Sequence, residues 1–387
     1  MVYLDNAATT RISDAVLQNM LPYLRIGYGN PGSVHTLGRQ SFEAVETARQ
    51  RVAFLLEIPA QNIIFTASAT EANNMVLRCT RERLRERPDI VVSAGEHDSI
   101  LRTAFDVERR EKGHVFKVPL MESGRIDTLA LMDIVERHKD SIGLVSIMRA
   151  NNETGAVNPV ENIFPKLQSL GILTHSDCVQ AAGTEPLEHI SPVCDFITLS
   201  AHKIHGPKGV GALYVKDKEA LVPLITGGSV QEYGLRGGTE NVAGIVGFGK
   251  ACELASKNLA ENVQNINMKS GKFFSVLTEQ LARMGLIDLL HFNGESQNSK
   301  TYSIRFDGIP AETLLMMLDA NEIYVSAGSA CTAHDTGLSH VLSAMGLSPE
   351  EIRSSIRISF STMNTMEEMV YAACGLATCV QRIHKSL

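Results

Sequence analysis

The sequence predicts an α/β protein with a mostly parallel sheet, followed by a smaller α+β region. Short apolar runs alternate with helical patterns over the first two thirds of the chain, and each run ends in small or polar residues. This alternation is typical of a sheet with helices on both faces. The pattern then changes to an alternating strand at 301–306. With 387 residues, the chain is long enough for two domains.

The predicted elements follow from these patterns in order. Residues 1–13 form an extended arm, and helical spacing predicts helices over 14–24, from Ser33 to near Pro59, and over 129–138. The small polar residues at 68–74 predict a tight turn into a further helix. Strands are predicted at 62–67, 90–93, 115–118, 144–148, 171–175, 196–199 and 212–215.

The second part of the chain begins after a glycine-dense loop at 226–241. A long helix is predicted from 242 to 258, and the next helix continues it after a bend to Met284. The remaining predicted elements are strands at 301–306, 323–326 and 356–360, a helix at 311–318, and a terminal helix from Thr365. We expect a large domain over 14–258 and a small domain formed by 1–13 together with 259–387.

Composition excludes several classes of protein. The formal net charge of −7 argues against a general nucleic-acid or membrane-surface binder, and no apolar run reaches the length of a membrane span. Seven cysteines are scattered without a Cys-x-x-Cys pair, so neither a disulfide framework nor a structural metal site is expected. Together with a start that does not resemble a signal peptide, this predicts a cytoplasmic protein.

Polar residues follow the predicted strands at their carboxyl ends, where ligands bind in sheets of this kind. Each has an ordinary structural interpretation alone, such as a helix cap or a loop side chain. Together they offer a lysine, a carboxylate, an amide, a flat ring and a helix N-terminus, which is what pyridoxal 5'-phosphate requires. These residues are Thr70, His97, Asn152, Asp177, Gln180, His202 and Lys203.

Two of the candidates have special chemistry. Lys203 lies between two apolar runs, and desolvation there would lower its pKa and make it a usable amine nucleophile, although a solvated loop lysine is the alternative. Cys331 lies in a loop of small residues, where a thiol is a better nucleophile than a buried one. The remaining cysteines, including Cys178 and Cys194, are interpreted as packing residues.

The chain also resembles a known family through motifs that fall in order along nearly its whole length. They are YLDNAATT at 3–10, SATE at 68–71, EH at 96–97, NNETG at 151–155, DCVQ at 177–180, HKIHGPKG at 202–209, GTEN at 238–241 and SAC at 329–331. This set resembles the cysteine desulfurases of the class V aminotransferase group. The resemblance implies the pyridoxal-phosphate fold type I, with a seven-stranded sheet in the large domain.

The resemblance also implies a role for each residue. Lys203 links to the cofactor and later moves protons, His97 stacks on its ring, and Asp177 and Gln180 contact its ring nitrogen and oxygen. Cys331 attacks the sulfur of the bound cysteine, leaving alanine and a persulfide. Asn152 and Arg357 bind the substrate carboxylate, and the other implied cofactor contacts are Ala69, Thr70, Asn152, Ser200, His202 and, from a partner subunit, Thr239.

The implied partners are L-cysteine, a second copy of the chain and a sulfur-accepting protein such as an iron–sulfur scaffold. The sulfur could serve iron–sulfur cluster assembly, tRNA thiolation or DNA phosphorothioation. Alternatives are a selenocysteine lyase, another class V enzyme such as an aminotransferase, or a non-catalytic sulfur carrier. The sequence departs from the family at 228–236, where two glycines and an arginine are replaced, and at Cys178, where a small residue is usual.

Overall fold

The computed structural model describes residues 1–80, 87–328 and 337–386. Its main sheet has seven strands in the order β2-β8-β7-β6-β5-β3-β4, and β8 runs antiparallel to both of its neighbours while the other pairs are parallel. The predicted α/β fold with a mostly parallel, seven-stranded sheet is therefore confirmed. The strands are β2 (Ile63–Thr66), β3 (Asp89–Ser93), β4 (Val115–Val118), β5 (Ile142–Ser146), β6 (Leu173–Asp177), β7 (Phe196–Ser200) and β8 (Gly211–Val215).

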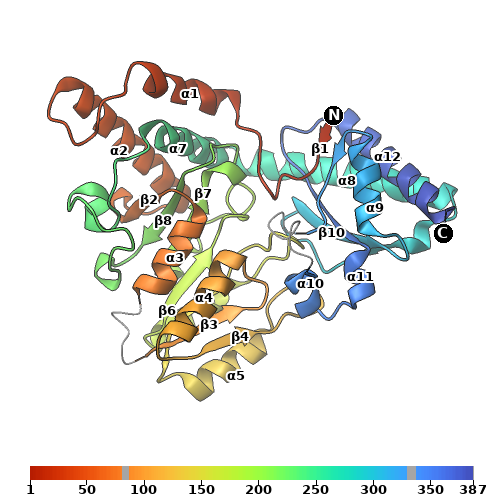
Figure 1. Ribbon diagram of the computed structural model, residues 1–387, viewed down its shortest axis with the longest axis horizontal. Coiled ribbons are helices and arrows are strands. Elements are labelled where there is room, and N and C mark those ends of the chain that lie inside the picture. The colour runs from red at the N-terminus through yellow and green to blue at the C-terminus, as the bar shows by residue number, and fades with distance from the viewer. Residues whose placement is uncertain (81–86, 329–336, 387) are drawn as a thin grey trace.

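Helices cover both faces of this sheet (Figure 1). On β3, Val91 packs into the core on one face while Ile90 and Val92 pack into the core on the other, as expected for a strand buried on both sides. α3 (Ala69–Cys79) and α4 (Asp98–Arg110) share the core of Ile90 and Val92. The opposite core takes residues from α1 (Asp14–Arg25), α2 (Thr36–Leu56), α5 (Thr128–His138), α6 (Val160–Ser169) and α7 (Val242–Lys257).

The C-terminal part of the chain has a core of its own. An antiparallel sheet places β10 (Thr301–Phe306) between β9 (Leu290–Phe292) and β12 (Ser355–Ser359). β1 (Val2–Tyr3) pairs with β11 (Ile323–Tyr324), so the N-terminal arm joins this core, and both termini lie on this side in Figure 1. The helices are α8 (Leu259–Arg283), α9 (Ala311–Asp319), α10 (His340–Ala344), α11 (Pro349–Arg353) and α12 (Met366–His384).

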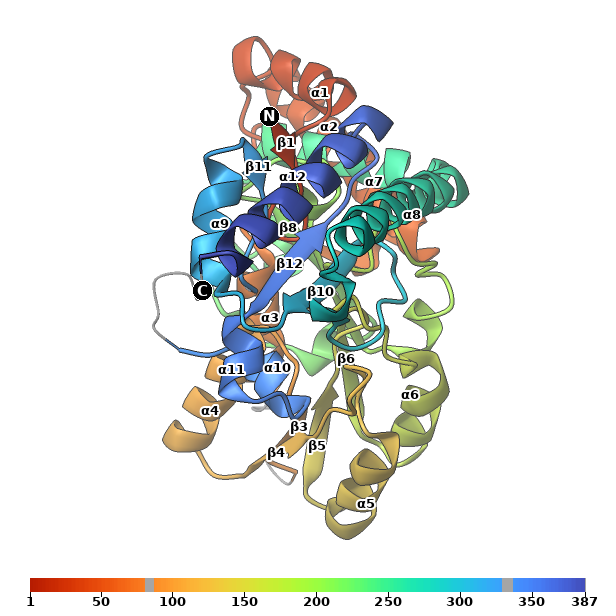
Figure 2. The same cartoon turned by 90° about the vertical axis from the view of Figure 1, so that its right-hand side faces the viewer.

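Figure 2 shows α8 and α12 side by side over β10 and β12, and residues of all four elements share this core. The expected division into a domain over 14–258 and one over 1–13 with 259–387 stays a prediction. Within the part of the chain that the structure describes, no helix is long and apolar enough to cross a membrane.

Some predicted boundaries were wrong for identifiable reasons. β6 ends at Asp177 rather than at 175, because Ser176 and Asp177 are polar but buried and continue the pairing with β7, opposite Ile197 and Thr198. β5 likewise covers 142–146 rather than 144–148. α2 begins at Thr36 rather than Ser33, because the His35 ring accepts a hydrogen bond from the Gly38 amide and caps the helix.

Cys178, Cys194, Cys252, Cys374 and Cys379 are free thiols in the part of the chain that the structure describes. Cys178 and Cys194 are completely buried in the core of the main sheet, and Cys379 is buried in the C-terminal core. Burial raises the pKa of the Cys178 thiol to about 12, so this residue packs and does not present a second reactive thiol. Cys331 lies outside the described residues.

The loop at 226–241, where the sequence departs from its family, is anchored by a buried ion pair. Arg49 donates to both carboxylate oxygens of Glu232, at 2.7 and 2.9 Å, and the Phe65 amide donates to the same carboxylate at 2.7 Å. Glu232 and Tyr233 have φ angles of 43° and 59°, a region that costs free energy for residues other than glycine. The buried ion pair holds this backbone in place.

Glu232→Gln is expected to lower the free energy of unfolding by ~2 kcal/mol, because the buried Arg49 guanidinium would lose its buried counter-charge and keep only the partly exposed Glu46. Denaturant unfolding measures this change. Glu279→Gln is the matched control, since it removes one partner of an exposed Arg283 ion pair and should cost no more than ~0.5 kcal/mol. Equal effects of the two substitutions would contradict the role assigned to the buried pair.

Candidate active site

A cavity of about 340 Å³ lies at the carboxyl ends of β6 and β7. The sequence-predicted residues come from elements far apart in the chain and meet in its wall. This is the place where a parallel sheet of this kind binds its ligands. The predicted residues that line it are Ala69, Thr70, His97, Asn152, Asp177, Gln180, Ser200, His202, Lys203 and Arg357.

Lys203 lies in the turn between β7 and β8, and its side chain is held by the N-terminal arm. Its Nζ donates to the backbone carbonyls of Ala7 and Ala8, at 2.6 and 2.8 Å. Burial, together with the nearby cations Arg357 and Lys300, lowers the pKa of Lys203 to about 7. The amine is therefore partly neutral near pH 7, as nucleophilic or acid–base chemistry requires.

Asp177 ends β6 with its carboxylate almost completely buried. Its two oxygens accept hydrogen bonds from Asn73 Nδ2 at 2.9 Å and from the Val179 amide at 3.0 Å. Gln180 lies beside it and donates to the Ala7 carbonyl at 2.8 Å, while its buried Oε1 has no partner within the described residues. The pair therefore presents a fixed carboxylate and a free amide oxygen to the cavity.

His97 caps the N-terminus of α4 and lines the cavity from the other side of the sheet edge. Its Nδ1 accepts from the Ser99 amide at 3.1 Å and lies 2.8 Å from Ser99 Oγ. These contacts fix the ring orientation. Burial lowers the pKa of His97, so the ring is neutral at pH 7, which suits a stacking role.

The N-terminus of α3 faces the cavity with two free amides. Ser68 caps the helix by accepting from the Glu71 amide at 3.1 Å, and the amides of Ala69 and Thr70 have no hydrogen-bond partner among the described residues. Helix N-termini of this kind favour anions. Gly211 packs against this turn, where an added Cβ would lie 2.8 Å from the Ser68 carbonyl carbon, so no larger residue fits.

Arg357 lies in β12 and brings the C-terminal core to the cavity. It is 1% exposed, and it donates to Asp5 Oδ1 at 2.8 Å and to the Asn152 carbonyl at 3.0 Å. Its Nε has no partner in the described part of the chain. A buried guanidinium with a free donor is suited to a carboxylate ligand.

Thr239 is exposed and does not line this cavity, so a role for it from a second subunit stays a prediction. Cys331 lies outside the described residues, and its role also stays a prediction. Sequence reasoning missed four contributors: Asp5, which pairs with Arg357; Asn73, which fixes Asp177; Ser99, which fixes His97; and Lys208, which lines the cavity. Asp5 lies in the YLDNAATT motif at 3–10, and this motif was the signal from which the sequence could have identified it.

This donor set fits pyridoxal 5'-phosphate. The free amides at α3 suit a phosphate, the buried Asp177 carboxylate suits a protonated ring nitrogen, and the free Gln180 Oε1 suits a ring hydroxyl. A metal centre has no such support, because residues 1–80, 87–328 and 337–386 contain no group of three His, Cys, Asp or Glu side chains placed to hold an ion.

Comparisons with known proteins agree with this geometry. The family described as aminotransferase class-V matches residues 2–371. A curated relative, "Cysteine desulfurase 2" of Trichormus variabilis, is 40% identical over 377 residues, which cover 95% of this chain and 90% of the relative.

Solved structures give the same result. One described as "NifS-like protein" is 35% identical and covers 100% of both chains with a TM-score of 0.88. Another, described as "SspA in complex with cysteine", is 30% identical with a TM-score of 0.77 and covers 94% of this chain and 100% of its own. The resemblance predicted from the motifs is confirmed: the chain belongs to the aminotransferase class-V family and, within it, to the cysteine desulfurases.

Proposed function

We propose that this protein removes sulfur from L-cysteine with the help of pyridoxal 5'-phosphate, giving L-alanine and a persulfide on Cys331. The observation that carries the proposal is the meeting of Lys203, Asp177 and Arg357 in one cavity. An amine with a pKa of about 7, a buried carboxylate and a buried arginine suit an amino-acid substrate and this cofactor. Membership of the cysteine desulfurases supports the same reaction.

The residues that would hold the cofactor divide by chemistry. The amides of Ala69 and Thr70 would bind its phosphate, with Ser200 and His202 beside them. Asp177 would keep the ring nitrogen protonated, and His97 would cover the ring. When bound, the cofactor withdraws electrons from the bonds next to the substrate's α-carbon.

Arg357 and Asn152 would bind and orient the carboxylate of L-cysteine. Asp5 already holds one side of the Arg357 guanidinium, so the side chain needs little reorganisation when the substrate arrives. Lys203 would take up and release protons near the substrate, since its pKa of about 7 makes both directions accessible at neutral pH.

Cys331 would supply the step that the cofactor cannot. Its thiolate would attack the substrate sulfur, forming the S–S bond while the substrate C–S bond breaks. The carbon retains that electron pair and is protonated, which yields L-alanine, and Cys331 becomes a persulfide. No external oxidant is consumed, because the two electrons that the sulfur loses on becoming persulfide sulfur stay with the carbon that becomes the methyl group of alanine.

The persulfide on Cys331 would be passed on to an acceptor. A persulfide can be handed to an iron–sulfur scaffold or used for tRNA thiolation or DNA phosphorothioation. A homodimer, in which Thr239 would reach the neighbouring site, and a cytoplasmic location stay predictions. Selenocysteine lyase activity is the competing function, and it differs from the proposed one in the substrate rather than in the residues.

Purified protein given L-cysteine and a reductant is expected to release alanine and sulfide in equal amounts. Amino-acid analysis and a sulfide assay on the same sample measure the ratio. Turnover of selenocysteine without turnover of cysteine would favour the competing lyase. A protein that binds the cofactor but releases no alanine from either would contradict the proposal.

Cys331→Ser is expected to bind the cofactor and L-cysteine normally but to lose at least about a hundredfold in alanine and sulfide production, because the persulfide cannot form. Cys374→Ser, which changes a partly buried thiol in α12, should keep full activity. Comparable rates for wild type and Cys331→Ser would remove Cys331 from the reaction.

Lys203→Ala is expected to abolish the visible absorbance of the bound cofactor, because it removes the cavity lysine whose pKa of about 7 makes its amine available to form the link. Absorption spectra before and after dialysis measure retention. Lys216→Ala, an exposed lysine after β8, is the control and should keep the wild-type spectrum. An unchanged spectrum in the Lys203 variant would assign the link to another group.

In cofactor-free protein, modification of Lys203 by an amine reagent should rise as the pH passes about 7. The folded-state pKa is lowered to about 7 from 10.5, so the reactive neutral amine forms above pH 7. Peptide mapping by mass spectrometry gives the pH profile, with the exposed Lys272 as reference. The same midpoint for both lysines would show that Lys203 is not desolvated as described.

A further inference from the structure

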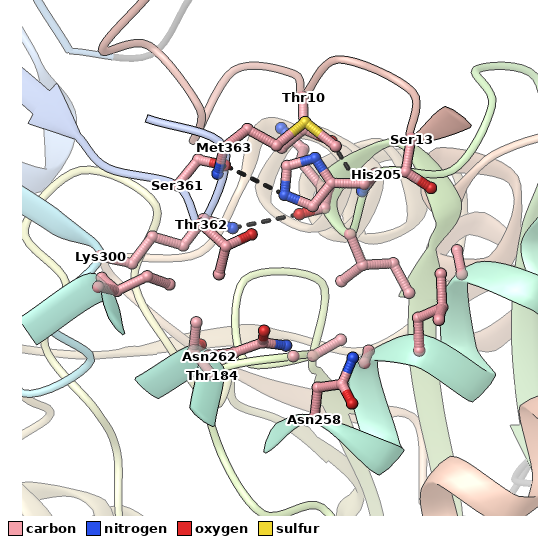
Figure 3. Close-up of a pocket in the computed structure, with 18 of the residues that line it drawn as sticks. Thr10, Ser13, Thr184, His205, Asn258, Asn262, Lys300, Ser361, Thr362 and Met363 are labelled. Atoms are coloured by element: carbon pink, nitrogen blue, oxygen red, sulfur yellow. Dashed lines mark hydrogen bonds between the residues drawn. The ribbon is translucent and has the colours of Figure 1, made fainter. Parts of the chain in front are cut away.

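A second cavity, of about 180 Å³, lies behind the turn that carries Lys203. It is bounded by the turn at 201–205, the junction of α7 and α8, and the segment at 360–363. Among the described residues, Lys203 is the one lining residue that the two cavities share. Figure 3 shows Lys300 and His205 on one side of this space and Asn258 and Asn262 on the other.

Lys300 is a buried cation that has no counter-ion among the described residues. It is 4% exposed, and no carboxylate of the described residues forms an ion pair with it. Its Nζ donates to the Lys203 carbonyl at 3.2 Å, which leaves further N–H groups for a ligand. Burial and the nearby Arg357 together lower the pKa of Lys300 to about 8, so the ammonium form dominates at pH 7.

The rest of the wall has a consistent chemistry. No acidic side chain is present among the described residues that line the cavity. Asn262 and Thr184 offer polar groups, and apolar side chains complete the wall: Ala182, Leu254, Ala255, Ile266 and Phe360. An uncompensated cation beside an apolar surface is suited to a ligand with one negative charge and a hydrocarbon part.

We propose that this cavity is a binding site for a small aliphatic monocarboxylic acid, held by its carboxylate at Lys300 with its alkyl chain against the apolar wall. The volume admits an acid of a few carbon atoms. An amino acid fits less well, because its ammonium group would meet the Lys300 cation and no acidic side chain among the described lining residues. A phosphate fits less well because a doubly charged anion would lose more hydration than one lysine replaces.

The site is reachable and lies close to the candidate active site. Asn258 is exposed and Met363 is 41% exposed, so the cavity opens to solvent at this edge. A bound acid would contact the lysine that is hydrogen-bonded to the Lys203 carbonyl. The proposal goes beyond the desulfurase function and does not require it, since the acid would occupy a different cavity.

The test is isothermal titration calorimetry of the purified holoprotein with acetate, propionate and butyrate at constant ionic strength. Saturable binding to one site is expected for at least one acid, with weaker binding of L-alanine and inorganic phosphate. Lys300→Met should weaken binding at least about tenfold, because it removes the charge that holds the carboxylate. Lys272→Met, which removes an exposed charge from α8, should bind as the wild type does.

A second variant keeps the test decisive if Lys300→Met fails to fold and separates this site from the carboxylate site expected at Arg357. Ala255→Leu fills the second cavity but leaves Lys300 and the candidate active site unchanged, so it too should weaken binding at least about tenfold. Absence of saturable binding to the wild type, equal binding of phosphate, or unchanged binding to Ala255→Leu would overturn the proposal. None of these outcomes bears on the desulfurase reaction.

Discussion

The side-chain amine of Lys203 is buried among other cations, and much of the surrounding structure holds it there. Its Nζ donates to two carbonyls of the N-terminal arm, and its backbone carbonyl accepts from Lys300. Removing a lysine from water favours the neutral amine, and neighbouring positive charges favour it further. The pKa of about 7 therefore depends on the folded arrangement of three separate chain segments.

The N-terminal arm is the main connection between these segments. Asp5 binds Arg357, the Ala7 carbonyl accepts from both Gln180 and Lys203, and the Ala7 amide donates to Ser359 Oγ. The arm thus joins the C-terminal core to the carboxyl edge of the main sheet. The sequence predicted only an extended arm for these residues. In the structure, they determine how Arg357, the candidate substrate-binding residue, faces Lys203, the candidate cofactor-binding residue.

The sequence predicted the parts of this arrangement that follow a local rule. Polar residues after apolar strands identified His97, Asp177 and Lys203, because the ends of parallel strands meet at one edge of a sheet. The rule misplaced the end of β6 by two residues, because Ser176 and Asp177 are polar yet buried and pair with β7 as part of the strand.

Contacts between segments far apart in the sequence could not be predicted from local patterns of polar and apolar residues. Asn73 meets Asp177 across 104 residues, Lys300 meets Lys203 across 97, and Asp5 meets Arg357 across 352. No periodicity or spacing encodes these pairs. The left-handed backbone at Glu232 and Tyr233 was likewise unpredictable, because it depends on the partner Arg49, which lies on α2.

The interior around the two cavities carries an excess of positive charge, and this excess has a consequence for ligand binding. Burial and the charges of Arg357 and Lys300 lower the pKa of Lys203, and Asp5 and Asp177 offset this only in part; burial and Arg357 also lower the pKa of Lys300. An interior with excess positive charge is less stable than a neutral one, and anions that bind only the folded protein offset this cost. A phosphate, a substrate carboxylate and a small acid would each reduce the imbalance. The same excess charge that weakens the unliganded fold therefore strengthens its affinity for anionic ligands.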